Sequence, residues 1–148
     1  MNKKFSVLIK DKIKKYNKKN ITVDLDKSIT HRCLFIAANC IGISRIRGLV
    51  SDDISATING LKLLGIKILK KKNSYYVYGN GISGFKKFSG VIDCGNSGST
   101  SRSFLGLLTC YPYTVTITGD SSLKKRPFKR LTPYLEKIGA NIIHPKNK

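Results

Sequence analysis

Apolar residues along the chain recur at helical and at strand spacing, and the two spacings predict alternating helices and strands. Between Ser28 and Cys40 they return every three or four residues, which predicts an amphipathic helix that Ser28 caps or opens. A second helix is expected to begin at Ser51-Asp52-Asp53 and to end at Gly65, because these residue types favour helix starts and stops. The same periodicity predicts further helices over residues 98–110 and 128–138.

Alternating or short apolar runs predict the strands between these helices. They cover residues 5–9, 21–25, 43–49, 66–69, 75–78, 113–118 and 140–143. Gly79-Asn80-Gly81 is interpreted as a hairpin turn. The result is an α/β (α+β) chain in which helices and strands alternate.

The pattern of the first half returns in the second half. Arg32 and Arg102, Gly48 and Gly119, and Gly65 and Gly139 form three pairs at an offset of about 70 residues. We therefore predict a duplicated strand–helix–strand–helix–strand unit, with repeat one at about 21–79 and repeat two at about 80–148. Residues 1–20 form an N-terminal strand and a Lys-rich linker in this interpretation. The second copy is expected to be cut short, because the chain ends where a further strand is due.

The charge favours anionic partners without deciding their class. The 148 residues carry a net charge of +20, with 22 Lys and 6 Arg, and 41% of the residues are hydrophobic. That apolar share is enough for a core and argues against disorder. Nucleic-acid readers rely on Arg for two-pronged contacts, so the lysine excess favours a solvated surface over a nucleic-acid face. A small basic nucleic-acid-binding protein stays open as the alternative.

Other classes find little support in the sequence. No stretch approaches the roughly 20 apolar residues of a membrane helix, and residues 5–9 are too short for a secretory signal, so a cytoplasmic location is expected. The cysteines form no C-x-x-C pair and no metal site is expected. Cys33 and Cys40, seven residues apart, are predicted to be reduced and buried on one helix face.

Two segments place cations beside the free amides of a predicted helix start. In the first, Lys27 and Ser28 open a helix and Arg32 lies one turn further on the face of Ser28. In the second, Asn96 and Gly98 precede Arg102 in a glycine-containing turn. Each arrangement predicts an anion site, although plain helix caps and turns remain the alternative reading. Lys124-Lys125-Arg126-Pro127 adds a third cationic cluster, with a solvated turn as its alternative.

Together these motifs resemble those of 5-enolpyruvylshikimate-3-phosphate synthases. The motifs, in the order of that family, are Asp26-Lys27-Ser28-x-x-His31-Arg32, Ser51-Asp52-Asp53, Leu64-Gly65, Gly79-Asn80-Gly81, Gly95-Asn96-Ser97-Gly98-Ser99 and Lys125-Arg126-Pro127. The resemblance implies a fold built from six βαβαββ units, of which roughly two are present here. The sister family, UDP-N-acetylglucosamine enolpyruvyl transferase, has Asn after the corresponding Lys, so Ser28 favours the shikimate branch.

The resemblance also implies a reaction and the residues that serve it. The enolpyruvyl group of phosphoenolpyruvate passes to the 5-hydroxyl of shikimate 3-phosphate, and phosphate leaves without a metal or cofactor. Lys27 is expected to be catalytic and to touch both substrates, while Ser28 and Arg32 hold shikimate 3-phosphate. The phosphoenolpyruvate site is expected to consist of Asn96, Gly98, Arg102 and Arg126, together with Lys27.

The chain departs from the family in one motif and in length. Asp24-Leu25 stands where Pro-Gly is usual, which is expected to tighten or shift the loop that carries Lys27. Family members are about three times as long, so we expect an N-terminal part that is inactive alone. A separate chain that carries the missing lobe is one expected partner.

Overall fold

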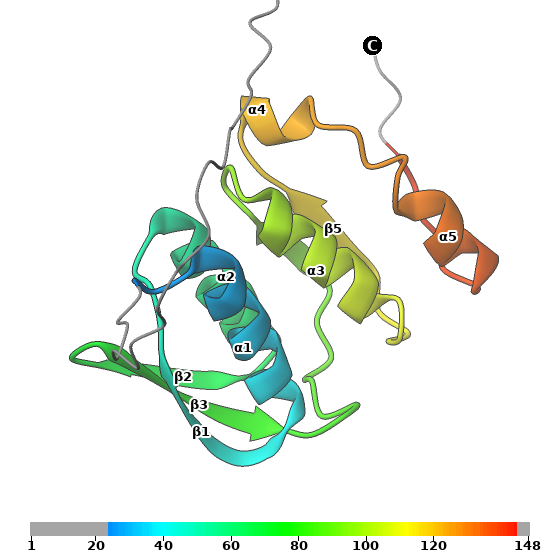
Figure 1. Cartoon of the computed structure of the whole chain (residues 1–148). Coiled ribbons are helices and arrows are strands. Elements are labelled where there is room, and N and C mark those ends of the chain that lie inside the picture. Colours follow the sequence, from blue (N-terminus) through cyan, green and yellow to red (C-terminus); the bar gives the residue numbers. More distant parts are fainter. Residues whose placement is uncertain (1–23, 145–148) are drawn as a thin grey trace, which may run out of the picture.

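The computed structural model describes residues 24–144 and shows a mixed helix and strand fold, as the sequence predicts (Figure 1). Its elements are α1 (Lys27–Asn39), β1 (Ile41–Arg47), α2 (Asp52–Leu63), β2 (Lys67–Lys71), β3 (Ser74–Asn80), β4 (Gly90–Asp93), α3 (Gly98–Leu108), β5 (Val115–Thr118), α4 (Ser121–Lys124) and α5 (Thr132–Lys137). The predicted strand over 5–9, the Lys-rich linker, most of the strand over 21–25 and the C-terminal residues 145–148 lie outside the described residues.

The first sheet is antiparallel, with strand order β1-β3-β2. Its inner side, which α1 and α2 cover in Figure 1, carries the buried residues Ile68 and Val77, paired across β2 and β3. Ile41 and Ile43 point to the other side and are 90% and 63% exposed. Ile41 and Ile43 of β1 therefore face outward, which is the reverse of the usual arrangement in which the apolar residues of a strand face the core.

The second sheet pairs β4 and β5 in parallel, and α3 makes the crossover between them. Phe104 of α3 is fully buried and meets Phe35 of α1 edge-on at 4.9 Å between ring centroids. A Cβ on Gly60 of α2 would collide with the same ring. The side chain of Phe104 therefore joins all three helices into one core, and Gly60 makes room for it.

The three long helices begin with the same cap. The side chains of Asp26, Ser51 and Ser97 accept a hydrogen bond from the backbone N–H of Ile29, Ile54 and Thr100, respectively. Asp26 thus caps α1, which corrects the expectation that Ser28 would do so; Ser28 is the second helical residue. A cap of this kind satisfies the third N–H of the helix and leaves the first two without an intrahelical acceptor.

Two elements predicted in the second half differ from the structure: the helix is shorter than expected and the strand is absent. The helix expected over 128–138 covers only Thr132–Lys137, because Pro133 lacks an N–H and fits only in the first helical turn. Residues 140–143 form no strand, and Ile143 is 86% exposed. A strand needs a neighbour to receive its backbone hydrogen bonds, and the described residues offer none there.

Other corrections concern residues near the end of α1 and two short elements of the second half. Gly79 and Asn80 belong to β3 instead of forming a hairpin turn; Gly79 faces the end of α1, where a Cβ would collide with the carbonyl oxygens of Ala37 and Cys40. Cys40 follows the last helical residue and is exposed, and Cys33 is half-buried, so the predicted buried pair is wrong. The short elements β4 and α4 were not predicted from the sequence.

A buried run of polar side chains ties α1, α2 and α3 together near their starts. Nδ1 of His31 lies 2.7 Å from Oγ1 of Thr57, which lies 2.7 Å from Oγ1 of Thr100. Oγ1 of Thr100 is in turn 2.7 Å from Oγ of Ser97 and 3.3 Å from the carbonyl oxygen of Asp53. Each hydroxyl is buried, so breaking this run would leave polar groups unsatisfied at a cost of about 1–3 kcal/mol each.

His31 makes folding stability depend on pH. Burial lowers the pKa of His31 below its ordinary value of 6.5, and the positive charge of Lys27 adds to this, while the negative charge of Asp53 opposes it. At a pH below about 6.5, His31 therefore binds a proton in the unfolded chain more readily than in the folded chain. The free energy of unfolding falls as the pH drops through this range.

We expect urea unfolding between about pH 7.5 and pH 5.5 to show this loss in the parent, with a slope of at most about 1.4 kcal/mol per pH unit. His31→Asn, which keeps a polar atom near Thr57, should flatten the dependence, and His144→Asn at an exposed position should leave it unchanged. Parallel curves for the parent and His31→Asn would contradict the assignment.

Candidate functional site

The starts of α1, α2 and α3 converge on one place. Nζ of Lys27, the first residue of α1, lies 2.6 Å from Oδ2 of Asp53 in the first turn of α2. The carbonyl oxygen of Asp53 accepts from Thr100 in the first turn of α3. Three positive helix ends, each with two N–H groups that lack intrahelical acceptors, are therefore gathered at one edge of the fold. Such an edge attracts anions.

Lys27 is positioned by an acidic neighbour that the sequence did not single out. Its side chain is 49% exposed and that of Asp53 is 24% exposed, so the ammonium group is held in place while remaining open to a ligand. Asp53 was interpreted only as part of a helix cap. Its location in the first turn beside Ser51, which already supplies the cap, was the signal that its carboxylate was free for another role.

Ser28 and Arg32 lie where the sequence placed them, on the outer side of α1. Both are exposed, and their spacing of one turn puts them on the same face as each other. Ser28 also contributes one of the N–H groups without an intrahelical acceptor. The arrangement offers a hydroxyl, an amide and a guanidinium to one ligand.

The residues of the second segment come together around Gly98. A Cβ built on Gly98 would lie 2.7 Å from Nη1 of Arg102 and 2.9 Å from Nη1 of Arg126. Nη2 of Arg126 donates to Oδ1 of Asn96 at 2.6 Å, and the guanidinium of Arg102 lies 5.5 Å from the ring centroid of Phe128. Asn96, Gly98, Arg102 and Arg126 thus form one cluster, although Arg126 is distant in sequence and follows α4.

This cluster carries positive charge that nearby carboxylates do not neutralise. Within residues 24–144, the Lys27–Asp53 pair is the only salt bridge, and neither Arg102 nor Arg126 takes part in one. Two guanidinium groups so close together repel each other, and an anion between them removes that repulsion. The start of α3 adds backbone N–H groups at the same point, so a carboxylate or phosphate fits the cluster.

The described part of the chain offers neither a metal-binding cluster nor a membrane-spanning helix. Residues 24–144 contain no group of three or more His, Cys, Asp or Glu side chains that could hold a metal ion. No helix among them combines the length and the apolar character needed to cross a bilayer. All four cysteines are free, and burial together with the charge of Asp93 raises the pKa of Cys94 to about 12.

Comparison with known proteins gives consistent results. Residues 11–148 match the family model of EPSP synthase (3-phosphoshikimate 1-carboxyvinyltransferase). The 3-phosphoshikimate 1-carboxyvinyltransferase of Sulfurihydrogenibium sp. is 40% identical over 124 residues, and that of Syntrophomonas wolfei is 43% identical over 126 residues. These alignments cover 83% and 84% of this chain. The chain spans 29% of the length of each of these curated relatives.

A solved structure leads to the same family. An EPSP synthase from Acinetobacter baumannii superposes with a TM-score of 0.77 at 32% sequence identity, covering 82% of this chain and 28% of that one. The fold class expected from the resemblance is thereby confirmed. The chain belongs to the EPSP synthase (3-phosphoshikimate 1-carboxyvinyltransferase) family.

Proposed function

We propose that this chain provides one wall of an enolpyruvyl-transferring site that takes shikimate 3-phosphate and phosphoenolpyruvate. In the reaction, the 5-hydroxyl oxygen of shikimate 3-phosphate bonds to C2 of phosphoenolpyruvate while C3 takes up a proton and the C2–C3 double bond becomes single. In a later step C3 loses a proton, the double bond forms again and the C2–O bond to phosphate breaks. The hydroxyl proton is lost and inorganic phosphate leaves. The observation that carries the proposal is the pair of unneutralised guanidinium groups over Gly98, beside the converging helix starts.

The proposed phosphoenolpyruvate site consists of Asn96, Gly98, Arg102 and Arg126. The close approach of both guanidinium groups to Gly98 supports this role, since a small trianion needs several donors within a few ångströms. The hydrogen bond from Arg126 to Asn96 fixes the direction of the guanidinium before the ligand arrives. A preorganised donor of this kind loses little freedom on binding.

Lys27 is proposed to be the residue shared by the two substrates. It stands at the start of α1, next to Ser28 and on the helix of Arg32, and its bond to Asp53 directs it toward the starts of α2 and α3. From there its ammonium group can stabilise negative charge that develops as the C–O bonds form and break. Asp53 is a positioning residue in this proposal, and Ser28 with Arg32 binds shikimate 3-phosphate.

Glycine at position 98 is predicted to be needed for phosphoenolpyruvate binding. Gly98→Ala should weaken binding about 10-fold to 100-fold by calorimetry, because its methyl group displaces both guanidinium groups and loses a charge-assisted bond of about 1.5–3 kcal/mol. Gly106→Ala is the matched control: it lies in the same helix with open space around its Cβ. It should keep the parent's affinity and gain about 0.5–1 kcal/mol in stability. Equal affinities in all three chains would contradict the site.

Arg32 is predicted to be needed for shikimate 3-phosphate. Arg32→Ala should lower the affinity at least about tenfold while the melting temperature stays near that of the parent, because Arg32 is exposed and its loss removes a charge-assisted bond. Arg130→Ala, another exposed arginine, controls for the general loss of charge. Should both variants bind as weakly as each other, Arg32 has no specific role.

The chain alone is predicted to give no turnover. Transition-state stabilisation requires groups on all sides of the two substrates and the exclusion of water. The residues of the proposed site provide such groups on one side only. We propose that the opposing groups come from a separate chain. Phosphate release by the 148-residue chain should therefore equal that of its Lys27→Ala variant. Release above that control would contradict the prediction.

The cytoplasmic location expected from the sequence also stays a prediction.

A further inference from the structure

The side of the first sheet that faces away from α1 and α2 combines tyrosines with cations. Strand register brings these side chains to one face, since Tyr76 pairs with Arg45 and Leu69, and Tyr78 pairs with Ile43 and Lys67. We call this surface the tyrosine–cation face and define it by Arg45, Arg47, Lys67, Lys71, Tyr76 and Tyr78. It holds two of the six arginines of the chain.

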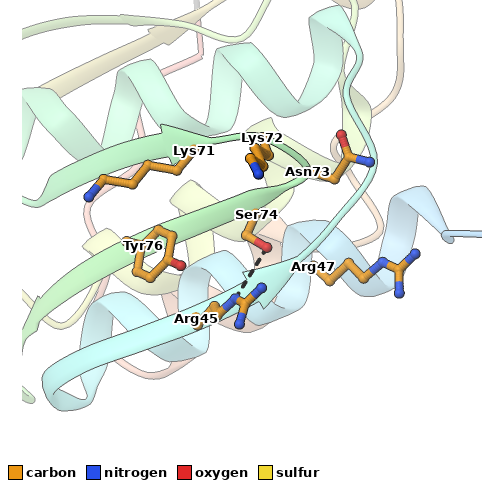
Figure 2. A pocket seen from close by; sticks show the side chains of 7 residues that line it. All are labelled: Arg45, Arg47, Lys71, Lys72, Asn73, Ser74 and Tyr76. Atoms are coloured by element: carbon orange, nitrogen blue, oxygen red, sulfur yellow. Dashed lines mark hydrogen bonds between the residues drawn. The ribbon is translucent and has the colours of Figure 1, made fainter.

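The cations of this face lie over the tyrosine rings. The guanidinium of Arg45 and the ammonium of Lys71 are 6.0 Å and 5.7 Å from the ring centroid of Tyr76. Nζ of Lys67 is 4.9 Å from the ring centroid of Tyr78. Figure 2 shows Tyr76 between Lys71 and Arg45, which come from the two edge strands. Cations thus lie on both sides of the two tyrosines, with the exposed Ile43 of β1 and Leu69 of β2 between or beside them.

One end of the face is hollowed. A cavity of about 470 Å³ lies between Arg45, Arg47, Lys71, Lys72 and Tyr76 (Figure 2). Nε of Arg45 donates to Oγ of Ser74 at 3.4 Å at its floor. Lys72 stands in the hairpin turn with a φ of 50°, a left-handed conformation in which glycine is easier to place, and its ammonium group adds to the charge of the cavity.

Negative charge is missing from this part of the described chain. None of the residues of β1, β2 and β3 is acidic, and the carboxylates of residues 24–144 lie in or beside α1, α2, β4, α4 and α5. The positive charge of the face is therefore not neutralised by the strands that form it. A polyanion complements it, and the face is turned away from the helices whose starts form the enolpyruvyl site.

We propose that the tyrosine–cation face binds single-stranded nucleic acid. Tyr76 and Tyr78 lie two residues apart on the central strand, about 7 Å from each other along it, and the two edge strands that carry the cations are about 10 Å apart. This is an extended arrangement, which suits a chain of phosphates better than one compact anion. Phosphates draw the cations off the rings, and the freed rings stack with bases, as in other platforms for single strands.

The test uses fluorescence anisotropy with the full chain and a labelled oligothymidine about 12 nucleotides long. The double variant Arg45→Gln/Lys71→Gln should bind at least about tenfold more weakly, and its slope of log affinity against log salt should be smaller by about 1.4 for two lost phosphate contacts. The matched control is Lys129→Gln/Lys137→Gln, which removes the same charge from exposed positions outside the sheet. The control should bind within about twofold of the parent. The four residues substituted in these two double variants are exposed, so both variants should fold like the parent, and thermal melting checks this.

Tyr76→Leu separates stacking from charge. It should weaken oligothymidine binding about tenfold and leave the binding of inorganic polyphosphate unchanged, because only the oligonucleotide has bases to stack. The proposal is overturned if the Arg45/Lys71 double variant binds like the parent, or if the control loses as much affinity as the double variant. Equal losses for oligothymidine and polyphosphate in Tyr76→Leu would overturn it too. So would tighter binding of blunt duplex DNA or of anionic lipid vesicles, each of which would identify a different occupant.

Discussion

The carbonyl oxygen of Asp53, with the two threonine hydroxyls around it, fixes where three helices begin. Oγ1 of Thr57 and Oγ1 of Thr100 lie 3.4 Å and 3.3 Å from this oxygen, and Nζ of Lys27 is bound to the side chain of the same residue. Because the hydroxyls are buried, water cannot replace their hydrogen bonds if the helices shift. The candidate site is therefore set by the core of the fold and not by independent loops.

Electrostatics then gives this meeting point its chemical character. Each of the three helices uses an oxygen-bearing cap for its third N–H and offers the first two to a ligand. Lys27 is partly neutralised by Asp53, whereas Arg102 and Arg126 share the space over Gly98 without a carboxylate. An anion relieves the repulsion between them. Small phosphorylated substrates match this demand.

The sequence predicted the strongly periodic parts of the fold and not the contacts between them. Helices α1, α2 and α3 follow from regular apolar spacing, and the repeat of Arg32 as Arg102 indicated two anion sites. The ion pair of Asp53 with Lys27 crosses from one helix to another, so no local pattern reveals it. The limits of α5 depend on Pro133, and the exposure of Ile41 depends on which side of the sheet the helices cover. Local spacing contains neither piece of information.

The starts of α1, α2 and α3 form one site for anionic ligands with two adjacent parts, at Lys27 and at Gly98, and backbone amide NMR tests this directly. Inorganic phosphate and phosphoenolpyruvate would be titrated separately into the isotopically labelled chain while the amide resonances are followed. We predict that the amides of Ser28, Asp53 and Ser99, one in the first turn of each helix, shift together with a single dissociation constant for each ligand. Shifts confined to other parts of the chain, or three unrelated dissociation constants, would contradict it.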